Sequence, residues 1–168
     1  MGRTENLRFD RAQLDFSSER LYVPVNPPET NMSVDVFSII VYSRHLDWQV
    51  SSAVQIFNAL SQTFSAVEHL TLSYGAHSQP SEERNGVDRT EWRKLLRSFS
   101  NVKTLRIEDG LVGELSRCLH LEDGEHSLEL LPELLELAYS GSGNASSAFT
   151  SFIDTRQNAG RPVTLIKS

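Results

Sequence analysis

Three groups of residues in this chain have types that can do chemistry, and the first is a glycine-rich turn. Gly141-Ser-Gly143-Asn-Ala-Ser146 lies between an expected strand and an expected helix, which is the context of a dinucleotide-binding fingerprint. Ser146 occupies the third glycine position, however, and no acidic residue follows the next expected strand. We therefore favour an ordinary strand–helix turn. A small nucleotide-binding α/β enzyme, built on Gly141 and Gly143, is the alternative.

Histidines and clustered carboxylates form the other two groups, because their side chains can bind metal ions or carry protons. The histidines have no metal-type helical spacing with a carboxylate, and the acidic turn Glu122-Asp-Gly-Glu125 lacks the alternating oxygen ligands of a calcium loop. The sequence contains no nucleophile elbow. We interpret these side chains as solvated and expect no catalytic residue, no metal site and no cofactor. The histidines are His45, His69, His77, His120 and His126.

Composition narrows the class of protein. The 168 residues make one domain or a piece of a larger one, with 39% hydrophobic and 23% charged residues. A net charge of −6 and a pI of about 5.3 do not suit a nucleic-acid binder. No apolar run approaches the ~18 residues of a membrane span, and the polar N-terminus does not resemble a signal peptide. Cys118, the single cysteine, excludes an internal disulfide and a cysteine-based zinc site. We expect an intracellular protein of the cytoplasm or nucleus, with no nucleic acid and no membrane as partner.

An apolar pattern at relative positions 1, 4 and 6 recurs along the chain and defines the elements that must position any site. It starts at Val36, Val67, Val102 and Leu134, with separations of 31, 35 and 32 residues. Each copy predicts a half-buried strand, and apolar residues at helical spacing follow it. Such units bury their apolar sides only by stacking on neighbours, so the repeat predicts an α/β solenoid with a mostly parallel sheet. Strands are expected near 36–43, 67–73, 102–107, 134–139 and 163–166, and helices near 48–64, 91–99, 111–120 and 145–158.

Residues 1–33 differ from the repeats at 34–168. They contain two or three short alternating stretches and a proline-rich turn, which we interpret as the first edge of the repeat array. Pro24 predicts that its strand lies at a sheet edge or ends early, because proline has no N–H for a ladder. Residues 76–89 have no periodicity and are expected to form a long exposed loop.

Local predictions concern a few side chains on the expected helices. Thr90 is expected to cap the helix near 91–99. Trp48 and Trp92, near helix starts, are expected to anchor the core. Asp154 and Arg156 are expected to form at most a surface pair.

Three separated blocks of the sequence resemble a known family. They are Asp47-Trp-Gln-Val-Ser-Ser52, the run from Trp92 to Leu105, and Arg156-Gln-Asn-Ala-Gly-Arg-Pro-Val163. They are similar to the C-terminal region of mushroom-type fungal F-box proteins, and the resemblance covers residues 34–168. It implies a leucine-rich-repeat-like solenoid segment, with a curved sheet and helices on its outer face. It also implies a substrate-recognition role in a ubiquitin ligase. Because the sequence has no F-box helices before the repeats, binding to the ligase adaptor is not expected.

The candidate binding surface is the face of the sheet that points away from the core. In a strand with the 1-4-6 pattern, positions 3, 5 and 7 lie on that face. We expect a non-enzymatic protein–protein interaction module that binds an unknown protein partner along this concave face, with a row through Ile40, Thr71, Arg106 and Glu136. A truncated gene product without independent function is a further alternative. The partner-binding candidates are Ile40, Tyr42, His69, Thr71, Thr104, Arg106, Glu108 and Glu136.

Overall fold

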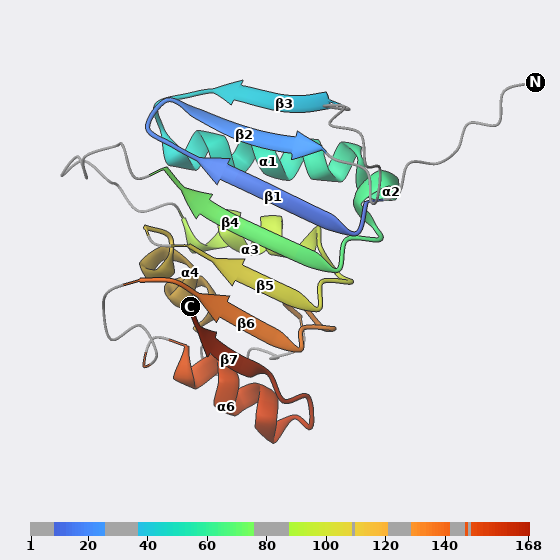
Figure 1. The fold of residues 1–168 in the computed structure, drawn as a ribbon, viewed down its shortest axis with the longest axis vertical. Helices are drawn as coiled ribbons and strands as arrows, with labels where there is room; N and C mark the ends of the chain where they lie inside the picture. Colours follow the sequence, from blue (N-terminus) through green and yellow to red (C-terminus); the bar gives the residue numbers. More distant parts are fainter. Residues whose placement is uncertain are drawn as a thin grey trace, which may run out of the picture.

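The structure is a computed structural model that describes residues 9–25, 37–75, 88–108, 110–120, 129–141, 147 and 149–168. These residues form an α/β fold with a seven-stranded sheet, and α1, α3 and α4 lie behind the sheet in the view of Figure 1. The strands are β1 (Arg11–Phe16), β2 (Arg20–Val25), β3 (Phe37–Tyr42), β4 (His69–Tyr74), β5 (Thr104–Ile107), β6 (Glu136–Tyr139) and β7 (Thr164–Lys167). The helices are α1 (Leu46–Ala59), α2 (Ser61–Phe64), α3 (Arg89–Arg97), α4 (Val112–Leu119) and α6 (Thr150–Asn158).

The sheet is mostly parallel, as the sequence predicted. Its strand order is β3-β2-β1-β4-β5-β6-β7. β2 is antiparallel to both β1 and β3, whereas β1, β4, β5, β6 and β7 are joined by parallel pairs. Each strand range expected from the apolar pattern overlaps one of these strands.

The repeat pattern correctly aligns three neighbouring strands. Leu70 pairs with Leu105, and Leu105 pairs with Leu137. These three residues hold position 4 of the pattern, and each is at most 1% exposed. The residues at position 6, Leu72, Ile107 and Tyr139, are also paired and buried. The same apolar spacing inside each copy therefore gives matching positions in neighbouring strands. A shift of one residue would turn every apolar side chain of a strand to the other face of the sheet.

The copy that begins at Val36 is not stacked beside the copy at Val67, and that prediction is wrong. β3 lies at the edge of the sheet, and both β2 and β1 separate it from β4. After β3 the chain runs along α1 behind β2 and β1 before it enters β4 (Figure 1). The apolar pattern of a strand determines which side is buried, but it does not determine which strand lies next to it.

Of the two alternatives predicted for the strand with Pro24, the edge position is wrong, because β2 lies between β1 and β3. The ladder between β2 and β1, however, ends before the proline. Pro24 pairs with Ser38 of β3. It lies beyond the two pairs, Asp15 with Tyr22 and Phe16 with Leu21, that join β2 to β1. The missing N–H of the proline therefore does not interrupt that ladder.

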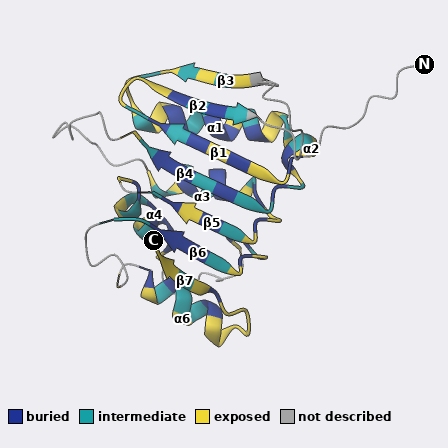
Figure 2. Ribbon diagram, in the orientation of Figure 1, coloured by how far each residue is buried: buried dark blue, intermediate teal, exposed yellow. Residues whose placement is uncertain are grey.

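The core lies between the sheet and the helices. Along β1, exposed or half-buried residues alternate with the buried Ala12, Leu14 and Phe16. Figure 2 shows this alternation on the strands. Aromatic rings join the two layers: the Phe16 and Trp92 ring centroids are 5.4 Å apart, in an edge-to-face arrangement. Trp92 is fully buried, as expected. Trp48 is 66% exposed, and its prediction as a core anchor is wrong.

The start of α3 differs from its prediction by two residues. Asp88 is the N-cap, and its carboxylate accepts a hydrogen bond of 2.9 Å from the backbone N–H of Thr90. This bond and the Thr90 hydroxyl lower the pKa of Asp88, because both stabilise the ionised form. An Asp two residues before the expected cap provides the same chemistry, so the helix begins at Arg89 instead.

Arg156 is buried in α6, and the expected surface pair with Asp154 is wrong. Its guanidinium donates hydrogen bonds to the backbone carbonyls of Leu131, Pro132 and Leu134 at 3.2, 3.2 and 3.0 Å. It lies 5.9 Å from the centroid of the Phe152 ring. Burial lowers the pKa of Arg156 because the charged form is desolvated. The side chain therefore holds the segment that leads into β6 against α6.

Candidate functional site

The face opposite α1, α3 and α4 carries the candidate residues, and we call it the open face. In the parallel part of the sheet these residues form rows across the strands. His69, Thr104 and Glu136 pair in one row, and Thr71 pairs with Arg106 in the next. Arg106 then pairs with Ala138, so the expected continuation from Arg106 to Glu136 is wrong by one row. All these residues occupy the alternate positions that point away from the core.

Ile40 and Tyr42 lie on the same face but far from the other candidates. They belong to β3 at the sheet edge, and they are 39% and 76% exposed. Two strands that the sequence did not place there, β2 and β1, fill the space between them and β4. The open-face residues of these strands include Gln13, Asp15 and Tyr22, which were missed as site residues.

The missed residues carried a usable signal. The alternation along Arg11–Phe16 predicts that one side of this strand is buried, and therefore that Gln13 and Asp15 lie on the other side. The sequence lacked information on neighbours. The parallel pairing of β1 with β4 joins segments that are 58 residues apart in the case of Asp15 and Ser73. Local periodicity cannot predict which strands pair when they are so far apart in the sequence.

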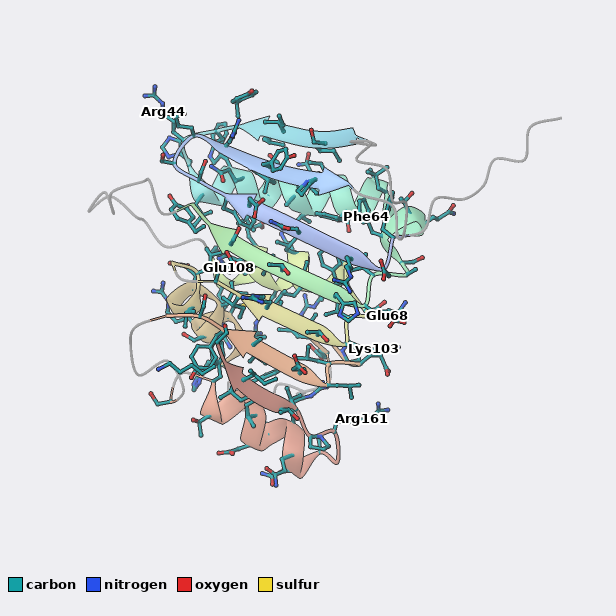
Figure 3. The ribbon with its side chains drawn as sticks, viewed as in Figure 1. Arg44, Phe64, Glu68, Lys103, Glu108 and Arg161 are labelled. Atoms are coloured by element: carbon teal, nitrogen blue, oxygen red, sulfur yellow. The ribbon has the colours of Figure 1, made fainter. Side chains whose placement is uncertain are left out.

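A shallow depression of about 520 Å³ lies on the open face at the carboxyl ends of the parallel strands. We call it the carboxyl-end depression. Its lining includes Asp15, Arg20, Tyr22, Ser73, Glu108 and Ser140. Figure 3 shows Glu108 at this end of the sheet and the ion pair of Glu68 with Lys103, 2.9 Å apart, at the opposite end. The depression thus spans β2, β1 and β4 and the residues directly after β5 and β6.

Asp15 is the central acceptor of the depression. Its carboxylate accepts hydrogen bonds from the Gln13 side-chain amide at 2.9 and 3.0 Å, one to each oxygen, and from the Ser73 hydroxyl. Ser73 is 8% exposed, so its hydroxyl is held in place by packing as well as by this bond. The backbone N–H of Glu108 donates to the carbonyl of Leu72 at 2.9 Å, which places Glu108 in the row next to Ser73.

Helix α1 and the β1–β2 turn fix the rim of the depression. The buried Gln49 side chain donates from its amide nitrogen to the carbonyls of Ser17 and Ser43, at 2.8 and 2.6 Å. Ser17 in turn closes the turn, because its backbone N–H donates to the Arg20 carbonyl at 2.9 Å. Through these bonds Gln49 of α1 connects the end of β1 with the end of β3, and the rim of the depression is held in position by helix α1.

The lining of the depression offers carboxylates, hydroxyls and one guanidinium for binding. No histidine lines it, and the described part of the chain contains no cluster of three metal-ligating side chains. Burial raises the pKa of the Cys118 thiol to about 12, which leaves it protonated and unreactive. In the glycine-rich turn, residues 142–146 lie outside the described residues, as do His77, His126 and the acidic turn at 122–125.

Within the described residues, no helix has both the length and the apolar character that crossing a membrane requires. Comparisons with models of protein families, with curated proteins and with solved structures found no match to this chain.

Proposed function

We propose that this protein is a non-enzymatic interaction module that binds a protein partner along the open face. From β4 to β7 the strands alternate along the chain with α3, α4 and α6, which is the strand–helix order that the proposed repeat units require. Modules of this design bind partners along an exposed sheet face. The sequence resemblance to the recognition region of fungal F-box proteins suggests the same use, with a substrate protein as the partner.

One observation carries the proposal: the open face presents both charged and apolar side chains across the sheet. Arg106 and Glu108 have side chains 51% and 44% exposed, and their charged atoms are 3.9 Å apart. Ile40 and Tyr42 at one edge, and Ile166 at the other, are among the exposed large hydrophobic residues of the described part of the chain. A face with both kinds of side chain can bind a protein partner through apolar burial and through complementary charge.

The proposal is tested by affinity capture with the face intact and then charge-reversed. The variant Arg106→Glu with Glu136→Lys reverses two charges on the open face and leaves the net charge unchanged. The matched control, Arg97→Glu with Glu129→Lys, reverses the 3.7 Å ion pair that joins α3 to the segment before β6. Both variants should fold, since all four residues are at least partly exposed.

The expected result is a set of proteins captured by the wild type and the control variant but lost by the open-face variant. Direct binding of one purified member should then weaken at least tenfold with the open-face variant, which corresponds to about 1.4 kcal/mol. If the captured proteins are the same for all three folded baits, the open face is not the binding surface and the proposal fails.

A further inference from the structure

The carboxyl-end depression lies where the two halves of the chain diverge. After β1 the chain turns back into β2 and β3, on one side of β1. After β4, the parallel neighbour of β1, it crosses through α3 to β5 on the other side. The depression lies between these two connections, at the carboxyl ends of β1 and β4.

The charged lining of the depression favours a cation. Asp15, Ser73 and Glu108 follow one another across three adjacent strands, so the Cα atoms of the two acidic residues lie about 10 Å apart, with a hydroxyl between them. An ionised carboxylate has about four acceptor sites, so Asp15 retains acceptor capacity beyond its bonds to Gln13 and Ser73.

The depression is lined by fewer basic side chains than acidic ones. Arg20 lines it at the rim and is exposed. Arg106 lies next to Glu108, but their separation of 3.9 Å and their exposure make this a weak pair that a partner can replace. Two carboxylates therefore face one lining guanidinium.

An apolar surface adjoins the acidic one in the same row. Tyr22 lines the depression and pairs across β2 and β3 with Ile40, which is 39% exposed. Tyr22 itself pairs with Asp15 on its other side. Moving along this row, a partner meets an aliphatic side chain, an aromatic ring and then the carboxylates.

We infer that the carboxyl-end depression binds a lysine or arginine side chain of the protein partner, and that an apolar side chain next to it packs on Ile40 and Tyr22. This inference rests on the proposed function and names the chemistry of the partner. The basic side chain donates to Asp15 and Glu108, and the Tyr22 ring offers a π face to the same cation. The apolar contact supplies burial, and the charges supply orientation.

The test uses randomised linear peptides displayed on phage, selected against the full chain. The baits are the wild type, the depression variant Asp15→Asn with Glu108→Gln, the apolar variant Ile40→Asp, and the control Glu129→Gln with Asp154→Asn. The control removes the same number of negative charges from exposed positions away from the open face. Asn and Gln keep the size of the carboxylates but retain one acceptor oxygen each and replace the other with an NH2 donor. Thermal melts verify that each bait is folded.

The expected peptides pair a Lys or Arg with an apolar residue, bind the wild type and the control equally, and bind the depression variant about fivefold to tenfold more weakly. Raising the salt concentration should weaken the wild-type complex but affect the depression variant less. Two results would overturn the inference and leave the proposed function standing. In the first, the peptides need Ile40 for binding but contain no basic residue. In the second, they need Ile40 but bind the depression variant as tightly as the wild type. If no selected peptide depends on either variant, both fail.

Discussion

Arg156 shows how one buried side chain can hold a segment of unusual conformation. Leu131 has a φ of +51°, which costs a residue with a side chain about 1–2 kcal/mol. Its carbonyl and those of Pro132 and Leu134 are bound by the guanidinium of Arg156, whose exposed fraction is 0%. The charged donors therefore stabilise backbone that regular secondary structure does not pair.

Arg156→Leu should destabilise the fold by about 2–4 kcal/mol, since a buried acceptor without a donor costs about 1–3 kcal/mol. Arg156→Lys should recover part of that loss, because an ammonium group cannot reach all three carbonyls in the geometry of a guanidinium. Urea unfolding measures both values. Arg161→Leu is the control, because this exposed residue makes a single 3.9 Å pair with Glu133 and should change stability by less than about 1 kcal/mol. Equal losses at positions 156 and 161 would contradict this role.

Cys118 allows a prediction about reactivity. Burial is the largest cause of its raised pKa, of about 12, and the charges of Arg93 and Arg89 oppose this shift without cancelling it. A raised thiol pKa means less thiolate at any pH below it. At pH 8 the native protein should therefore hold about a thousandfold less thiolate than an unfolded chain, whose thiol pKa is about 8.5.

The native thiol should consequently react with a chromogenic disulfide reagent at pH 8 at least a hundredfold more slowly than in guanidinium chloride. The unfolded protein serves as the control, because it has the same single cysteine. Rapid modification of the native chain, at a rate near that of the unfolded one, would show that the thiol is accessible and ionised.

At the scale of elements, the sequence predicted what local patterns can encode. The 1-4-6 spacing predicted the class of fold and aligned β4, β5 and β6, because a period of two fixes the buried side of each strand. It did not predict the order of β3, β2 and β1, since both arrangements bury the same side chains. Thus the predicted row was correct from Thr71 to Arg106 and wrong by one residue pair at Glu136. Asp15 and Tyr22, which complete the depression, were missed.

Engineered cysteines can test the strand order directly. Gln13 and Thr71 pair in register on the open face of adjacent strands. Their Cα atoms should therefore be about 4.8 Å apart, within the range of about 4.4–6.8 Å that disulfides span. The double variant Gln13→Cys with Thr71→Cys is expected to form a disulfide under mild oxidation. Mass spectrometry after alkylation of the unfolded protein would then find one remaining thiol, that of Cys118.

The pair Ile40→Cys with Thr71→Cys is the matched comparison. In the observed order, three strand spacings separate β3 from β4, which is about 14 Å. This variant should keep all its thiols free. A disulfide between positions 40 and 71, with none between 13 and 71, would instead support the directly stacked repeat that the sequence predicted and would contradict the sheet order.

At the scale of the whole molecule, the helices bury their apolar sides against the sheet. Each longer helix of the described part buries one stripe, such as Val50 and Phe57 in α1, Leu95 in α3 and Leu115 in α4. Among the large apolar side chains of these helices, the exposed one is Trp48. The described helices therefore expose little apolar surface that a partner could bind, whereas the open face exposes both apolar and charged side chains.

This difference yields a prediction about the ligase adaptor of F-box proteins. An F-box docks on that adaptor through an apolar helix surface, whereas the apolar stripes of α1, α3 and α4 already cover the sheet. Residues 1–168 alone should therefore not bind the adaptor with a Kd of about 1 μM or tighter, which corresponds to about −8 kcal/mol. Calorimetry with purified adaptor measures this, and an authentic F-box fragment is the positive control. A micromolar complex that Trp48→Ala weakens would place a docking surface at the start of α1 and refute the prediction. Peptide binding at the open face without adaptor binding is the combination that the proposed interaction module predicts for these residues.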